Sequence, residues 1–274
     1  MTTASEWATP PTRPGEIEHI ISGVDRYNPQ NLTALSEYLS HQLETGEYDC
    51  LANLAILKLF QFNPADFDYS IVISVLLKAL TAAPFPDFNL CIALLGEAPV
   101  DVIPQPAAAL PEEATEEEKA AAAEENAKAQ AAPSAGHLSD PLMARLAQLS
   151  SLLLSARFRA FWEAYKSQEY QDVRQHAANV NGFEDAVRRV ALHSVKSAFT
   201  QISTDRLGSY LDLSGNELAT FMKTQPEWRI EGDKVHVPIN ADNEVKATVI
   251  REDIQLDQLT KFLSQAQTPV LRAA

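Results

Sequence analysis

Residues 48–64 read YDCLANLAILKLFQFNP, a run that is apolar at most positions. Between Cys50 and Phe62 the apolar residues are interrupted only by Asn53, Lys58 and Gln61. Pro64 cannot continue a helix and ends the segment. A helix that is apolar on nearly every side has to be covered by neighbouring helices. This stretch therefore predicts a fold of stacked helices, with residues 48–63 in the middle of the stack.

Helical signals continue on both sides of this segment. Asn28-Pro29 and Asp140-Pro141 each combine a capping side chain with a proline suited to the first helical position. Apolar residues then recur at helical spacing, and one face is aromatic, which is typical of a core. The aromatic residues are Phe158, Phe161, Trp162 and Tyr165. The expected helices span about residues 28–46, 48–63, 68–80, 87–95, 140–153, 158–165 and 181–199.

The segment from about residue 100 to 138 has a different composition. It consists mainly of Pro, Ala and Glu, and between Pro104 and His137 it holds seven Glu against two Lys. Such a segment buries too little apolar surface to offset the entropy lost on ordering. Its centre, residues 112–130, has a high intrinsic helix propensity. We therefore expect an insertion, either an exposed helix or a loop, that contributes nothing to the core.

The last 75 residues change pattern again. A short helix is expected after Ser203, and residues 214–217 read SGNE, which fits a capping box at the start of the next helix. Residues 228–231 and 234–237 alternate around Gly232-Asp233, as in a two-residue hairpin. Two helices followed by a hairpin predict a winged-helix domain. A final helix, about residues 253–265, presents an apolar face formed by Leu256, Leu259, Phe262 and Leu263.

The charge of the chain disfavours nucleic acid as a partner. The formal net charge is -15, and from residue 200 onward eight Lys and Arg stand against eleven Asp and Glu. A winged helix that binds DNA inserts its second helix into the groove and contacts phosphates with cations. Here that helix carries one cation, Lys223, and one carboxylate, Glu217. We therefore expect protein docking and no direct contact with DNA.

The sequence predicts no enzyme, no cofactor and no metal site. Its six histidines show no metal-ligand spacing with other side chains, and it contains no phosphate loop and no nucleophile elbow. A catalytic Cys-His pair whose members come together only in the folded chain stays possible at this point. However, Cys50 and Cys91 lie in apolar helices where a thiol is inert. Two such cysteines, no signal peptide and no run of eighteen apolar residues favour a soluble, cytoplasmic protein.

Several blocks of the chain resemble the subunit K family of eukaryotic translation initiation factor 3. They are residues 23–32 (GVDRYNPQNL), 48–64, 75–80 with 87–91, 158–163 (FRAFWE) and 182–188 (GFEDAVR). Residues 213–228 agree more loosely. The blocks follow one another in the family's order over most of the chain, and the acidic segment of residues 100–138 is the main departure.

The resemblance implies a mainly α fold with two domains. A HEAT-like helical-repeat domain of the PCI type covers residues 16–200 and includes the insertion at about 100–138. A small α+β winged-helix domain with a terminal helix covers residues 201–265. Residues 1–15 are expected to form a disordered tail, and residues 266–274 a second tail.

The resemblance also implies a function. Members of this family are non-catalytic scaffold subunits of the initiation factor 3 complex, which supports preinitiation complex assembly on the small ribosomal subunit. The expected partner is subunit L, with the subunit designated E nearby, and the expected compartment is the cytoplasm. No catalytic or cofactor-binding residues are implied, and no membrane or small-molecule substrate.

Winged helices of this group associate through the hairpin and their terminal helices. The resemblance therefore implies a partner interface formed by Val235, Val237, Leu256, Leu259, Phe262 and Leu263. Alternatively, the terminal helix only closes its own domain. Two other functions stay open at this point: a free-standing cytosolic adaptor or regulatory protein of the same fold, and a direct RNA binder.

Overall fold

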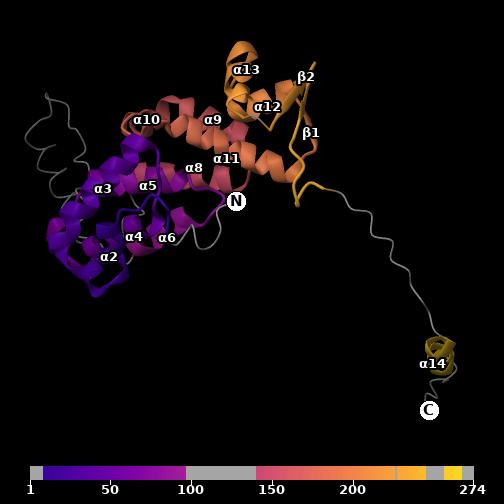
Figure 1. Cartoon of the computed structure of the whole chain (residues 1–274), viewed down its shortest axis with the longest axis horizontal. Coiled ribbons are helices and arrows are strands. Elements are labelled where there is room, and N and C mark those ends of the chain that lie inside the picture. Colours follow the sequence, from indigo (N-terminus) through magenta and orange to yellow (C-terminus); the bar gives the residue numbers. More distant parts are fainter. Residues whose placement is uncertain (1–8, 97–139, 226, 245–255, 267–274) are drawn as a thin grey trace, which may run out of the picture.

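The computed structural model describes residues 9–96, 140–225, 227–244 and 256–266 (Figure 1). The described chain is a stack of helices that ends in a small three-stranded sheet with two more helices. This arrangement confirms the predicted class, a helical-repeat fold followed by a small α+β winged-helix domain. The predicted insertion at residues 100–138 lies outside the described residues, and the predicted domain boundaries stay a prediction.

The first part of the stack surrounds the segment that the sequence placed in the middle. Helix α4 packs against α2, α3, α5 and α6, and the side chains of Ile56, Leu57, Leu59 and Phe60 are at most 1% exposed. The central position of this helix is confirmed, although Phe62 at its end is exposed. The elements are α2 (Gly15–Ser22), η1 (Val24–Tyr27), η2 (Pro29–Asn31), α3 (Leu32–Thr45), α4 (Cys50–Phe62), η3 (Pro64–Asp66), α5 (Tyr69–Leu80) and α6 (Asp87–Gly96).

Capping side chains begin α5 and α8 (Pro141–Leu154), and the cap at Asp140 was predicted, whereas the predicted cap Asn28 begins the short η2 instead of α3. The Asp68 carboxylate accepts a hydrogen bond from the backbone N–H of Ser70 at 2.8 Å. Asp140 accepts one from Leu142 at 2.8 Å, so both side chains satisfy a backbone donor of the first helical turn. At the other end of α3, Gly46 adopts a left-handed conformation with φ of 79°, which glycine tolerates without steric cost.

A buried polar network ties the start of the described chain to the stack. The Arg13 guanidinium donates to both oxygens of Asp49, at 2.6 and 2.8 Å, and to Glu18 at 2.6 Å. Gln42 accepts from the backbone N–H of Asp49 and exchanges hydrogen bonds with Asn53. Arg13, which the sequence assigned to a tail of residues 1–15, is 2% exposed and paired with a buried carboxylate.

The second part of the stack continues from the first, because α8 packs against α5. All four residues of the predicted aromatic face on α9 are at most 5% exposed, which confirms their role in the core. Helix α10, which buries Val173 and Ala177, was not predicted, because seven residues carry too short a pattern. The elements are α8 (Pro141–Leu154), α9 (Phe158–Lys166), η6 (Gln168–Tyr170), α10 (Gln171–Ala177) and α11 (Phe183–Ala198).

The last part of the described chain has winged-helix topology. The antiparallel sheet has the order β1-β3-β2, with β3 in the centre. The hairpin between β2 and β3 is confirmed, whereas β1, a strand of three residues, was not predicted. The capping box at Ser214 is wrong, because its side chain makes no capping hydrogen bond. The elements are β1 (Gln201–Ser203), α12 (Thr204–Leu211), α13 (Gly215–Lys223), β2 (Arg229–Glu231), β3 (Lys234–His236) and, further on, α14 (Leu256–Ala266).

Direct hydrogen bonds join the winged helix to the helical stack. The indole Nε1 of Trp162 on α9 donates to the carbonyl of Tyr210 on α12 at 2.9 Å. Arg188 on α11 donates to the carbonyl of Leu211 at 3.1 Å. Because α12 packs on both α9 and α11, the two parts form one continuous body.

Candidate interaction surfaces

Helix α14 presents the apolar face that the sequence predicted. Leucine and phenylalanine side chains recur at three- and four-residue spacing, which places them along one side of the helix. Their exposed fractions are 81% for Leu256, 48% for Leu259, 76% for Phe262 and 58% for Leu263. In Figure 1 the helix stands apart from the remaining elements. The structure therefore does not show α14 closing its own winged helix, and the face is open to a partner.

The wing differs from the expected interface. Val235 is 0% exposed and Val237 is 6% exposed, because β3 is the central strand and packs on α12. Neither side chain is accessible to a partner in this arrangement, so both belong to the core. Ile230 lies opposite Val235 on the edge strand β2 and is 42% exposed. The sequence pattern of the hairpin already included Ile230. Which hairpin strand lies at the edge of the sheet, however, depends on β1, which pairs with β3 and leaves β2 at the edge.

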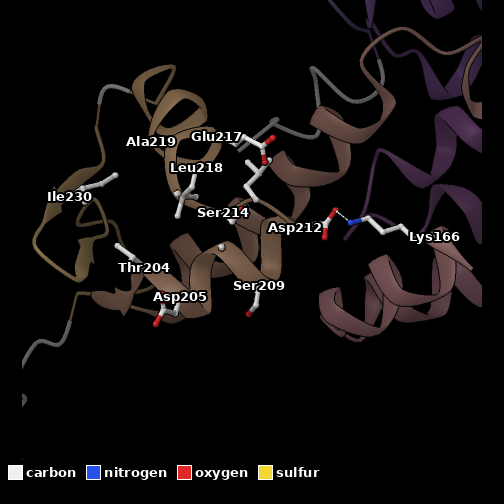
Figure 2. A pocket seen from close by; sticks show the side chains of 13 residues that line it. Lys166, Thr204, Asp205, Ser209, Asp212, Ser214, Glu217, Leu218, Ala219 and Ile230 are labelled. Carbon is white, nitrogen blue, oxygen red and sulfur yellow. Dashed lines mark ion pairs between the residues drawn. The ribbon is translucent and has the colours of Figure 1, made fainter.

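A hollow of about 670 Å³ is lined mainly by α12, α13 and the turn between them, with Lys166 from the end of α9 and Ile230 from β2 (Figure 2). The only cation in its lining is Lys166, whose ammonium forms an ion pair with Asp212 at 2.5 Å. Asp205 and Glu217 add two further carboxylates. The surface beside the second helix of the winged helix is therefore acidic, which opposes contact with a phosphate backbone.

The thiols are not activated. Burial and the charge of Asp87 raise the pKa of Cys50 to about 12, and burial also raises the pKa of Cys91. A thiol in this state is protonated at neutral pH and is a poor nucleophile. In the described part of the chain no group of His, Cys, Asp and Glu side chains is arranged to hold a metal ion. Among the same residues, no helix has the length and hydrophobicity needed to span a membrane.

These features define a class of protein: a helical repeat that ends in a winged helix and exposes apolar side chains on its last helix. Comparisons with known proteins agree with this class. The sequence model of the CSN8/PSMD8/EIF3K family matches residues 66–249. A protein of Mycosarcoma maydis named eukaryotic translation initiation factor 3 subunit K is 56% identical, over 99% of this chain and 98% of the relative.

Relatives of the same name are found in other fungi. The protein of Cryptococcus neoformans is 36% identical over 95% of both chains. The protein of Botryotinia fuckeliana is 34% identical over 93% of this chain and 95% of its own length. The chain therefore belongs to the CSN8/PSMD8/EIF3K family and, within it, to the subunit K family of eukaryotic translation initiation factor 3.

Proposed function

We propose that this chain is a non-catalytic scaffold subunit of the eukaryotic translation initiation factor 3 complex. It supports preinitiation complex assembly on the small ribosomal subunit through protein docking, in the cytoplasm. Its membership of the subunit K family supports its assignment to this complex. The exposed apolar face of α14 is the observation that supports docking as its mechanism.

The energetics of α14 favour a partner. An isolated helix of 11 residues is only marginally stable in water, so this one gains stability when its apolar face is covered. Burial of apolar surface contributes roughly 25 cal/mol per Å². A stable contact buries about 800 Å² on each partner, which α14 can supply together with the edge strand β2 around Ile230. Following the family, subunit L is the proposed partner at this surface, and the subunit designated E lies nearby.

The experiment is co-purification with subunit L. Replacement of Leu259 and Phe262 by Ser removes two of the four side chains of the apolar face, and truncation after Glu252 removes the whole helix. Both changes are expected to abolish or strongly reduce the recovery of subunit L. Replacement of Asp257 and Lys261 by Ser alters two residues on the opposite face and serves as the control. Undiminished recovery with the truncated chain would contradict docking through α14.

The charges of the described surface disfavour the alternative of direct RNA binding. RNA binding by the isolated chain would fall steeply with salt concentration, whereas we expect no salt-dependent binding. A free-standing adaptor would be recovered from cytosol without the other subunits, and mass spectrometry of the co-purified proteins distinguishes that outcome.

A further inference from the structure

A second exposed patch lies on the helical stack and takes no part in the contacts proposed above. It consists of Val24 and Tyr27 on η1 and of Phe62 at the end of α4. Their exposed fractions are 83%, 44% and 57%. Large apolar side chains that gather on a surface mark interaction sites more often than single exposed ones do. We call these three residues, with Arg26 and Lys58, the aromatic patch.

The aromatic patch is organised by ring contacts. The rings of Tyr27 and Phe62 meet edge to face, with centroids 5.8 Å apart. The Arg26 guanidinium lies 4.9 Å from the centre of the Tyr27 ring, and the Lys58 ammonium lies 5.0 Å from the centre of the Phe62 ring. Each exposed ring therefore makes a cation–π contact, which holds the ring and its cation in place.

These two cations are available to an anionic group. Lys58 donates a hydrogen bond to the neutral side chain of Gln61 at 2.6 Å. Within the described residues neither Lys58 nor Arg26 forms an ion pair. Glu18, which lies close by, accepts from Arg13. The patch therefore carries two cations that form no ion pair among the described residues, on a chain whose formal net charge is -15.

A hollow of about 370 Å³ adjoins the rings. Tyr27, Arg26 and Lys58 line it on the side of the patch, and its apolar wall is formed by Leu51, Leu54 and Leu94. A hollow of this size holds one large side chain. Its lining thus combines an apolar surface for an anchor with three cations, Arg13, Arg26 and Lys58, and one carboxylate, Glu18, so cations are in excess.

We propose that the aromatic patch binds an acidic segment of a neighbouring protein that carries a large apolar side chain. The apolar side chain fills the hollow against Tyr27 and the leucines, and carboxylates of the segment pair with Arg26 and Lys58. Charge complementarity selects this occupant, because two cations beside an apolar hollow suit a peptide better than a phosphate backbone, which needs a longer row of cations.

The test uses the full chain in its assembled complex, with p-benzoylphenylalanine in place of Phe62. After irradiation, mass spectrometry identifies the cross-linked peptide. The same photoreactive residue at Leu154, which is 39% exposed at the end of α8, serves as the control position. We expect a peptide of another polypeptide, with net negative charge and an aromatic or branched apolar residue.

Reversal of the two charges, Arg26→Glu with Lys58→Glu, tests the recognition. Two partly exposed ion pairs contribute about 0.5 kcal/mol each, so the yield of cross-link is expected to fall by about fivefold. Both side chains lie at the surface, and the circular dichroism spectrum verifies that the variant is folded. The proposal is overturned by a cross-link within this chain itself, by a neutral or basic peptide, by a yield no higher than at Leu154, or by a yield that charge reversal leaves unchanged.

Discussion

Arg13 and Asp49 hold the first described residues against the start of α4. The Asp49 carboxylate also accepts from the backbone N–H of Ala52 at 3.1 Å, so one buried group both pairs with arginine and caps the helix. Two charged hydrogen bonds with fork geometry bind more strongly than one. The contact therefore links a segment of polar composition to the core of the stack.

Arg13→Gln is expected to lower the free energy of unfolding by about 3–5 kcal/mol, because it leaves the buried Asp49 charge without its partner. Arg145→Gln is the control, since Arg145 pairs with Asp172 in a contact that is about a third exposed on both sides. That control should lose at most about 1 kcal/mol. Urea denaturation of the two variants measures the difference, and equal losses would contradict the buried role of Arg13.

Because of Lys78, the free energy of unfolding is expected to vary with pH in the alkaline range. Its side chain is 2% exposed, and its ammonium donates to the carbonyl of Gln42 at 3.0 Å. Burial, with a smaller effect of Arg189, lowers the pKa of Lys78 from 10.5 to about 8. Between these two values the unfolded chain binds the proton and the folded chain releases it, so stability rises with pH through this window and falls as pH drops to 8.

Lys78→Met is expected to remove this pH dependence. The free energy of unfolding, measured by urea denaturation at pH 7.5, 8.5 and 9.5, should rise more in the wild type than in the variant. The difference should approach about 3 kcal/mol over the full window, from 1.36 kcal/mol for each pKa unit. Parallel pH profiles of the two proteins would show that Lys78 is not the group that titrates.

At the scale of elements, a close approach fixes the turn between α12 and α13. A Cβ atom on Gly208 would lie 2.6 Å from the carbonyl oxygen of Leu213, a backbone atom that cannot move alone. The Leu213 N–H donates to the carbonyl of Gly208 at 3.0 Å, which holds the turn against the helix. Glycine is therefore required at this position for steric reasons.

Gly208→Ala is expected to destabilise the winged helix by about 1–3 kcal/mol, because the added methyl group pushes the turn away from α12. Gly96→Ala is the matched control, since among the described residues no atom outside its own helix backbone and chain neighbours lies within 4 Å of the added Cβ. The control should change stability by less than about 1 kcal/mol. Thermal unfolding compares the two, and a melting temperature unaffected by Gly208→Ala would refute the steric argument.

Local chemistry explains which elements the sequence could predict. Asp140 indicated a helix because a capping side chain acts on a backbone group two residues away. Strand β1 was not predicted because its three residues are ordered only by pairing with β3, more than thirty positions later. The same long-range pairing buries Val235 and leaves Ile230 at the edge. Arg13 was missed for the same reason, since its partner Asp49 lies 36 residues away.

At the scale of the whole molecule, the two candidate surfaces belong to different parts of the chain. Figure 1 shows α2 and α4, which adjoin the aromatic patch, at the end of the stack away from the winged helix. Between them lies a packed body in which α8 contacts α5 and α12 contacts α9 and α11. The aromatic patch belongs to this packed body, whereas the apolar face belongs to α14, which follows the winged helix in the chain. Two surfaces on such different elements can engage different partners, as a scaffold requires.

The two surfaces are therefore expected to act independently. Tyr27→Ser with Phe62→Ser should leave the recovery of subunit L unchanged, because residues far apart without shared partners contribute additively. Leu259→Ser with Phe262→Ser should reduce that recovery and, in chains that still assemble, leave the cross-link from position 62 intact. Co-purification and cross-linking of all four combinations of wild-type and altered surfaces measure this. Loss of subunit L from the patch variant would mean that both surfaces serve one partner, and the scaffold would then span one protein instead of joining two.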